Sequence, residues 1–209
     1  MEIIAHRGTW NTIEQQNTLQ SFYKSFEINV GIETDLRDLN GKLVISHNCP
    51  INGSVNSIDD FFLSYIKSKS INTLAINIKS DGLQDLLDKK LNEHKIKNYF
   101  VFDMSIPDTL GYIKKNLKIF TRQSEFELEP IFYDQSIGVW LDSFDSTWFD
   151  ASLISKHLEN GKKVAIVSPE LHKREKNELW HMLKEDNIFL NNNILLCTDF
   201  PLEAQIFFK

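Results

Sequence analysis

The chain has 209 residues, which is enough for one domain with a sizeable core, so we expect a single domain over residues 1–209. Its net charge of −6 argues against a general nucleic-acid-binding surface, which would be basic. No run approaches about 18 consecutive apolar residues and no secretory leader opens the sequence, so we expect a cytoplasmic protein without stable membrane insertion.

The first apolar run, Ile3 to Ala5, is typical of a buried strand. It ends at His6, Arg7 and Gly8, so a strand is expected to deliver a histidine and an arginine at its carboxyl end, followed by a glycine turn. An imidazole can move a proton near neutral pH, and a guanidinium binds phosphate.

A helix is predicted after Thr18, which is a suitable N-cap residue. Its apolar residues recur at helical spacing, at Leu19, Phe22 and Phe26. Gly31 is predicted to end this helix.

The second strand is predicted over residues 32–36, where apolar and polar residues alternate. Glu33 and Asp35 are two residues apart, so both carboxylates point to the same side of this strand. Asn40-Gly41 is a strong hairpin signal, and the returning strand over residues 43–45 should bring His47 close to the acid pair.

The rest of the chain alternates between predicted strands and helices. Strands are expected over residues 73–78, 99–102, 117–120, 138–141, 163–167 and 194–196, and helices over residues 57–66, 83–91 and 106–113. No convincing helix is found over residues 125–136. About eight strand-helix units predict an α/β fold of the closed (β/α)8 TIM-barrel type, with a small hairpin insertion after the second strand.

Several polar side chains stand at predicted strand ends, where such a barrel carries its substrate groups. Asn77 and Lys79 lie on one face at the end of the strand over residues 73–78, and we expect Lys79 to contact phosphate. Arg122 and Asp142 end two later strands and are candidate substrate-binding residues. The other histidines lie in helix or loop contexts without acid partners at strand ends and are predicted to be surface or capping residues: His94, His157, His172 and His181.

Five motifs together resemble the glycerophosphodiester phosphodiesterase family, which belongs to the phosphatidylinositol-phospholipase-C-like barrels. They are His6-Arg7-Gly8, Gln16-Asn17-Thr18, Glu33-Thr34-Asp35, His47, and Thr198-Asp199-Phe200-Pro201, in the family's order. Taken together they span the chain from the first strand to the last, so the resemblance implies a divergent member of that family.

The resemblance implies one divalent cation, Mg²⁺ or Ca²⁺, held by Glu33, Asp35 and the residue at position 77. That residue is Asn77 where the family pattern has a third carboxylate, so a weaker cation site is expected. Gln16 and Asn48 likewise stand where the family has acids.

The resemblance also implies a metal-dependent phosphodiesterase in which His6 and His47 carry out acid-base catalysis and Arg7 binds phosphate. The expected substrate is a small soluble diester, such as a glycerophosphodiester or a glycerol- or sugar-phosphate conjugate. The three amides leave an alternative open, namely a catalytically weakened barrel that binds a phosphorylated ligand without cleaving it.

Overall fold

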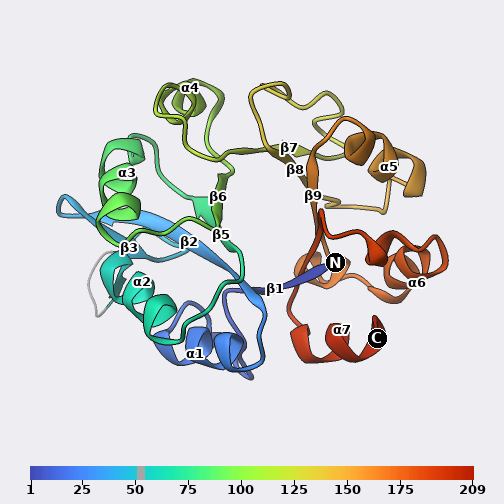
Figure 1. The fold of residues 1–209 in the computed structure, drawn as a ribbon, viewed down its shortest axis with the longest axis horizontal. Helices are drawn as coiled ribbons and strands as arrows, with labels where there is room; N and C mark the ends of the chain where they lie inside the picture. Colours follow the sequence, from blue (N-terminus) through green and yellow to red (C-terminus); the bar gives the residue numbers. More distant parts are fainter. Residues whose placement is uncertain (51–54) are drawn as a thin grey trace. The chain divides into compact units, whose positions relative to one another are not determined.

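The computed structural model describes residues 1–50 and 55–209 and shows an α/β fold with a mixed sheet (Figure 1). Its contacts divide the chain into two compact units. We call Ala5–Lys118 the N-terminal unit, and Met1–Ile4 with Ile119–Lys209 the C-terminal unit. Strand β1 (Glu2–His6) contains residues of both. The predicted single domain over residues 1–209 stays a prediction.

The N-terminal unit contains a mixed sheet in which β2, β5 and β6 are parallel neighbours. The strands are β2 (Gly31–Leu39), β3 (Lys42–Ile45), β4 (Asn56–Ser57), β5 (Leu74–Ile78) and β6 (Tyr99–Phe102). The helices are η1 (Ile13–Gln15), α1 (Leu19–Glu27), α2 (Ile58–Lys67), α3 (Gln84–Glu93) and α4 (Ile106–Lys114).

An antiparallel pair extends this sheet beyond β2. Leu39 of β2 stands opposite Lys42 of β3, and the two residues between them, Asn40 and Gly41, have φ angles of 51° and 74°. Such a two-residue turn needs positive φ at both positions, which asparagine and glycine tolerate. Strand β3 then pairs antiparallel with the short β4, which the sequence did not predict.

Helix α1 begins as predicted, because the Thr18 side chain accepts a hydrogen bond from the Ser21 backbone N–H. The prediction that Gly31 ends this helix is wrong. The helix ends at Glu27, the chain turns at Asn29 with a φ of 57°, and Gly31 is the first residue of β2. Asparagine tolerates the left-handed conformation, so the turn does not need a glycine.

The C-terminal unit contains four parallel strands in the order β7-β8-β9-β10. They are β7 (Phe120–Gln123), β8 (Gly138–Leu141), β9 (Lys163–Val167) and β10 (Ile194–Thr198). The helices are α5 (Ala151–Glu159), η2 (Pro169–His172), α6 (Asn177–Glu185), η3 (Ile188–Leu190) and α7 (Pro201–Phe207), with α5 and α6 on one side of β8 and β9 (Figure 1). As predicted, the segment 125–136 contains no helix, whereas β7 starts at Phe120 rather than at Leu117.

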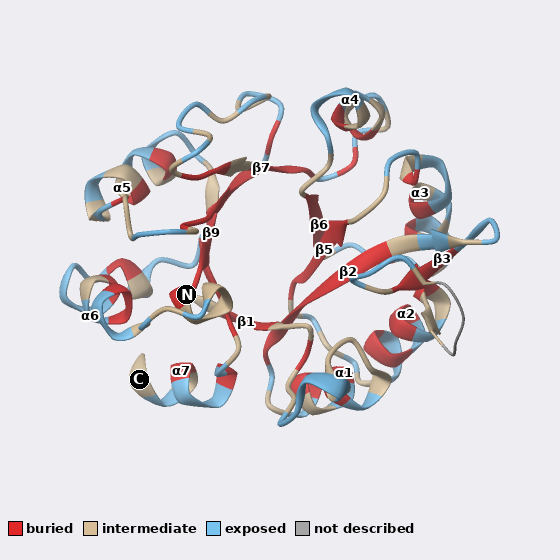
Figure 2. Ribbon diagram, turned by 180° about the vertical axis from the view of Figure 1, so that it is seen from behind, coloured by how far each residue is buried: buried red, intermediate tan, exposed pale blue. Residues whose placement is uncertain are grey.

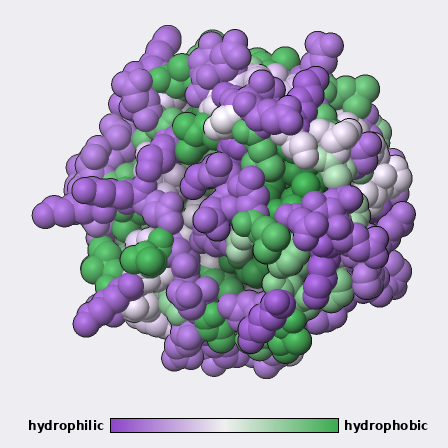
Figure 3. Space-filling model, turned by 45° about the vertical axis from the view of Figure 1, so that its right-hand side comes forward, coloured by the Kyte–Doolittle hydropathy of each residue, from purple (hydrophilic) through white to green (hydrophobic). Residues whose placement is uncertain are grey.

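The strands form the buried part of each unit, and the helices expose one side (Figure 2). Every residue of β5 and of β10 is buried, as expected for parallel strands that are covered on both faces. The face shown in Figure 3 is covered mainly by hydrophilic side chains, with smaller hydrophobic patches between them. None of the described helices is long and apolar enough to cross a membrane.

Candidate active site

Two carboxylates of β2 lie close to an amide near the carboxyl end of β5. Glu33 and Asp35 of β2 have exposed fractions of 2% and 0%, and Asn77 of β5 has 7%. The parallel register of the two strands sets Asp35 directly beside Asn77. The predicted alternation in β2 therefore turns both acids inward, where a carboxylate is costly unless cations or hydrogen-bond donors compensate it.

Two cations compensate Asp35. Arg7 Nε lies 2.9 Å from Asp35 Oδ2, and Lys79 Nζ lies 3.5 Å from Asp35 Oδ1. The Arg7 backbone N–H also donates to the Glu33 carbonyl oxygen at 2.9 Å. Gly8 then allows the chain to turn, because it has a φ of 84° and a Cβ at this position would lie 2.5 Å from Ser21 Oγ.

Glu33 is the more strained of the two carboxylates. Burial raises its pKa to about 7, and the neighbouring charge of Asp35 pushes in the same direction, while His6, Arg7 and Lys79 oppose the shift. His6 Nε2 lies 3.9 Å from Glu33 Oε2. The site therefore holds a histidine beside a carboxyl group that titrates near neutral pH.

Asn17 connects three parts of this site. Its Nδ2 donates to Asp35 Oδ2 at 2.9 Å, and its Oδ1 accepts from Thr34 Oγ1 at 2.7 Å. Its backbone N–H donates to the Arg7 carbonyl at 3.0 Å, and its own carbonyl accepts from Asn56 Nδ2 at 3.1 Å. Asn17 thereby fixes the Asp35 carboxylate, a positioning role that the motif alone did not reveal.

A polar cleft of about 420 Å³ opens beside Arg7. Its lining includes Gln16, Asn17, Ser46, His47 and Asn48. Gln16 Oε1 accepts a hydrogen bond from Arg7 Nη1 at 3.1 Å. The amide at position 16 therefore holds the arginine through a hydrogen bond from a charged donor to a neutral acceptor.

His47 is exposed and lines this cleft. The residue before it, Ser46, donates its backbone N–H to the Asp35 carbonyl at 3.0 Å, so β3 returns His47 to the neighbourhood of the acid pair as predicted. His47 Nδ1 lies 3.1 Å from Asn48 Oδ1. An amide oxygen only accepts, so in the neutral ring Nδ1 carries the hydrogen and Nε2 keeps its lone pair.

The oxygens of Glu33, Asp35 and Asn77 suit a hard divalent cation. Asp35 Oδ1 and Asn77 Oδ1 are both buried, and neither accepts a hydrogen bond. A buried oxygen atom that accepts no hydrogen bond needs another electropositive partner, and a bound cation can be that partner. Within the described residues no group of three or more His, Cys, Asp or Glu side chains is placed so that it could hold a metal ion.

The two candidate substrate residues of the C-terminal unit have partners of their own. Arg122, in β7, forms an ion pair with Glu127. Asp142 follows β8, is 7% exposed, and accepts hydrogen bonds through Oδ1 from the Ser143 backbone at 2.8 Å and from His172 Nε2 at 2.7 Å. Their roles in substrate binding stay predictions.

The prediction that the four remaining histidines are surface or capping residues without acid partners at strand ends is wrong for His157 and His172, whereas His94 is the C-cap residue of α3. His172 binds Asp142, and His94 Nε2 lies 2.7 Å from Asp59 Oδ1. His157 is buried, and only His181 is exposed, with its ring against Phe207. The partners lie about 30 residues away in sequence, so no local pattern could reveal them.

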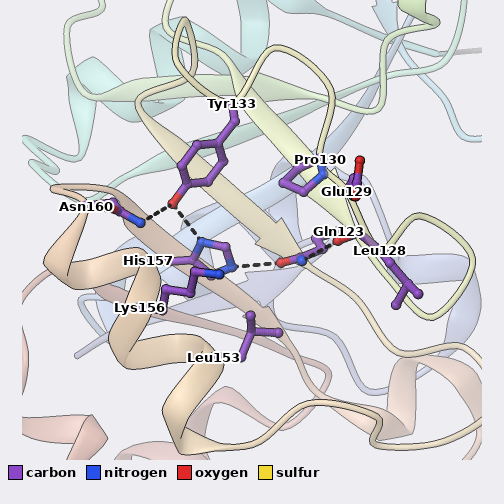
Figure 4. Close-up of a pocket in the computed structure, with 9 residues that line it drawn as sticks. All are labelled: Gln123, Leu128, Glu129, Pro130, Tyr133, Leu153, Lys156, His157 and Asn160. Carbon is purple, nitrogen blue, oxygen red and sulfur yellow. Dashed lines mark hydrogen bonds between the residues drawn. The ribbon is translucent and has the colours of Figure 1, made fainter.

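A second pocket, of about 250 Å³, lies beside His157 in the C-terminal unit (Figure 4). His157 Nε2 lies 2.7 Å from Gln123 Oε1, and His157 Nδ1 lies 2.9 Å from Tyr133 Oη, which also accepts from Asn160 Nδ2 at 3.4 Å. Burial, and then the nearby Lys156, lower the pKa of His157. Gln123 Nε2 donates to the Leu128 carbonyl at 2.7 Å, so Gln123 Oε1 accepts, His157 Nε2 donates, and Tyr133 donates to Nδ1.

Comparison with known proteins finds similarity at the level of structure. No family model and no curated protein matches the sequence. A glycerophosphodiester phosphodiesterase from Parabacteroides distasonis matches with a TM-score of 0.71 and 17% identity, over 99% of this chain and 96% of its own.

Two further solved structures match over a similar extent. A phosphodiesterase from Oleispira antarctica, solved with the product sn-glycerol-3-phosphate, gives a TM-score of 0.68 and 14% identity over 99% of this chain and 96% of its own. A glycerophosphodiester phosphodiesterase from Agrobacterium tumefaciens gives 0.66 and 12% over 97% and 99%. The chain therefore matches the fold of several glycerophosphodiester phosphodiesterases over nearly its whole length, at low sequence identity.

Proposed function

We propose that the chain is a metal-dependent phosphodiesterase that cleaves a small water-soluble diester, either a glycerophosphodiester or a glycerol- or sugar-phosphate conjugate. One observation carries the proposal. Two buried carboxylates, Glu33 and Asp35, lie beside Arg7, Lys79 and His6. This set combines ligands for a hard cation, cations for a phosphate and a proton carrier.

The proposal includes the fold in its finer form, a closed (β/α)8 barrel with the β2–β3 hairpin as an insertion. The match to glycerophosphodiester phosphodiesterases over 99% of the chain supports it. Arg122 and Asp142 are proposed to bind substrate, because active sites in such barrels lie at the carboxyl ends of the strands. A cytoplasmic location is part of the same proposal.

Arg7 and Lys79 bind the phosphate oxygens in this mechanism. One of the two histidines, His6 or His47, deprotonates the attacking hydroxyl, and the other protonates the leaving alkoxide. The attacking group is either water or a neighbouring hydroxyl of the substrate, which would give a monoester directly or a cyclic phosphate first. Phosphorus NMR of the products distinguishes the two routes.

Glu33, Asp35 and Asn77 would hold one Mg²⁺ or Ca²⁺ ion. When bound, the ion supplies Lewis-acid stabilisation of the negative charge that develops on the phosphoryl group. The amide at position 77 contributes an oxygen without charge, so affinity for the ion should be lower than with three carboxylates.

A panel of small phosphodiesters, assayed with Mg²⁺, Ca²⁺ and Mn²⁺, tests the function. We expect turnover of at least one glycerophosphodiester, its loss on adding chelator, and its return with a divalent ion. No product from any member of the panel would overturn the proposal. Strong binding to liposomes would instead redirect the substrate assignment toward bilayer lipid.

A second function is favoured by the three amides, Gln16, Asn48 and Asn77, and by the ion pairs that already balance Asp35. In this alternative the chain binds an intact phosphorylated ligand without cleaving it. A binder needs neither a Lewis acid nor a proton donor at the leaving oxygen. Retention of an uncleaved diester that is insensitive to chelator would therefore identify the binder.

A further inference from the structure

The charges around the acid pair are balanced before any ligand binds. With both carboxylates ionised, as at pH 8, Glu33 and Asp35 supply two negative charges, and Arg7 and Lys79 supply two positive charges. Arg37 adds a cation further along the same face of β2, where its Nε donates to the His47 carbonyl at 3.0 Å. The site therefore has no surplus of negative charge.

With His6 and His47 counted as neutral, the other polar groups of the site do not change this balance. Asn77, Gln16 and Asn17 are neutral amides. Glu14 also lines the cleft, but it is fully exposed, so solvent and salt screen its charge.

A divalent ion on Asp35 would compete with the cations that now hold this carboxylate. Arg7 Nε at 2.9 Å and Lys79 Nζ at 3.5 Å face the two oxygens of Asp35, the second of which accepts no hydrogen bond. With an ion on Asp35, the positive charges of Arg7 and Lys79 would no longer be compensated by this carboxylate. The loaded site would then carry a surplus of at least two positive charges, because the ion is added to a set without surplus negative charge.

We propose that the ion-loaded site selects a phosphomonoester dianion over a phosphodiester, so that the product of the reaction binds more tightly than its substrate. This inference rests on the proposed function, since it uses the same cation site. A phosphodiester carries one negative charge and leaves the site unbalanced, whereas a phosphomonoester carries close to two at neutral pH. Asn77 sets this preference. A carboxylate at position 77 would lower the surplus positive charge of the loaded site by one, which would favour the singly charged diester.

The size of the preference follows from one additional charge pair. Two unit charges 4 Å apart interact by about 1 kcal/mol in water and more in a partly buried site. We therefore expect the monoester to bind about fivefold more tightly than the diester, or better.

A titration of the protein with methyl phosphate and with dimethyl phosphate, at fixed free Mg²⁺ and followed by phosphorus NMR, tests the inference at pH 8. The two probes differ by one methyl group and one charge. We expect methyl phosphate to bind about fivefold or more tightly in the wild type, and Asn77→Asp to reduce that ratio toward one. Aspartate has the shape of asparagine, so the variant changes charge and little else. The ratio also cancels any change in ion occupancy or folded fraction.

The matched control is Asn116→Asp, which adds the same charge at an exposed residue whose φ of 55° aspartate tolerates. This variant should leave the ratio unchanged.

Equal affinities in the wild type, or a ratio that Asn77→Asp does not reduce, would overturn the inference and leave the phosphodiesterase proposal standing, because that proposal depends on turnover. Failure of both probes to bind at millimolar concentration would also overturn the inference. The diester panel then decides the proposed function by itself.

Discussion

Both units bury polar side chains, and two of the buried groups, one from each unit, differ in charge and in completeness. In the N-terminal unit Glu33 and Asp35 are buried charges, and oxygens of Asp35 and Asn77 lack hydrogen-bond donors. In the C-terminal unit His157 is buried as a neutral ring with a partner on each nitrogen. The group in the N-terminal unit is charged and has oxygen atoms without hydrogen-bond donors, whereas the group around His157 is neutral and its ring nitrogens both have hydrogen-bond partners.

The difference indicates what each group does. A fully satisfied polar chain rigidifies a fold, and it has no free donor or acceptor to offer a ligand. Buried carboxylates with open oxygens cost stability, and proteins keep such groups where a ligand completes them. We therefore assign the chemistry to the acid pair and a structural role to the chain around His157.

The largest expected effect is on turnover. His6→Ala and His47→Ala should each lower the rate by about 10²–10⁴-fold, because each removes a proton carrier. His181→Ala is the control, since this exposed ring only packs against Phe207. Initial rates with the best diester of the panel measure the effect. Full activity in His47→Ala would rule out the two-histidine mechanism.

The next effect is a gain of stability when the strained carboxylate is neutralised. The folded pKa of Glu33, about 7, lies above its ordinary value of 4.5, so the folded state binds more protons between these two values. Stability is therefore lost as pH rises from 4.5 to 7, by about 3 kcal/mol. Glu33→Gln should recover most of this free energy of unfolding at pH 8 and none of it at pH 4. Urea unfolding in the presence of chelator measures the effect.

The control for this prediction is Glu27→Gln, which changes an exposed carboxyl group of α1. It should leave the pH dependence of stability unchanged. If the Glu33→Gln protein were less stable than the wild type at pH 8, the prediction would be wrong, because the nearby cations would then stabilise the Glu33 carboxylate by more than its burial costs.

A smaller effect is expected from the chain around His157. Tyr133→Phe leaves the buried Nδ1 of His157 without a donor, which should cost about 1–3 kcal/mol of unfolding free energy. Turnover should not change. Tyr23→Phe, at a side chain with an exposed fraction of 38%, is the control. If Tyr133→Phe lowered turnover and kept stability, the second pocket would have to take part in the chemistry.

The smallest effect is the pH response of His157, opposite in sign to that of Glu33. Burial and Lys156 hold its folded pKa below 6.5, so the unfolded chain takes up the proton first as pH falls. The stability from this residue is present above pH 6.5 and is lost below it. In the Glu33→Gln protein, which lacks the opposing effect of Glu33, the free energy of unfolding should fall as the pH falls below 6.5. This pH dependence should disappear when His157→Gln is added. If the pH dependence persisted in the double variant, the effect would belong to another titratable group.

Much of the fold could be predicted because the strands are continuous apolar runs between turn residues. The predicted bounds 99–102, 138–141 and 163–167 are those of β6, β8 and β9. The end of α1 was missed because either Asn29 or Gly31 could supply a left-handed turn, and the tertiary context chose Asn29. The two-residue β4 is too short to leave any periodic signal.

Local alternation and one turn were sufficient to place Glu33, Asp35 and His47 near one another, since each step depends only on neighbouring residues. The ion pairs of Asp35 with Arg7 and Lys79 also follow from strand ends that meet. The pairing of His172 with Asp142 could not be predicted, because residues 30 apart in sequence are brought together only by the fold.

Asn17 restricts the sequences that this site can accept. Its φ of 57° favours glycine, asparagine and aspartate over the other residues. Glycine has no side-chain donor for Asp35 Oδ2, and aspartate would bring a third carboxylate against the acid pair where an N–H group now donates at 2.9 Å. Asparagine alone meets both the backbone and the side-chain requirement. In a saturation mutagenesis scan, position 17 should therefore tolerate as little change as the residues that carry the chemistry.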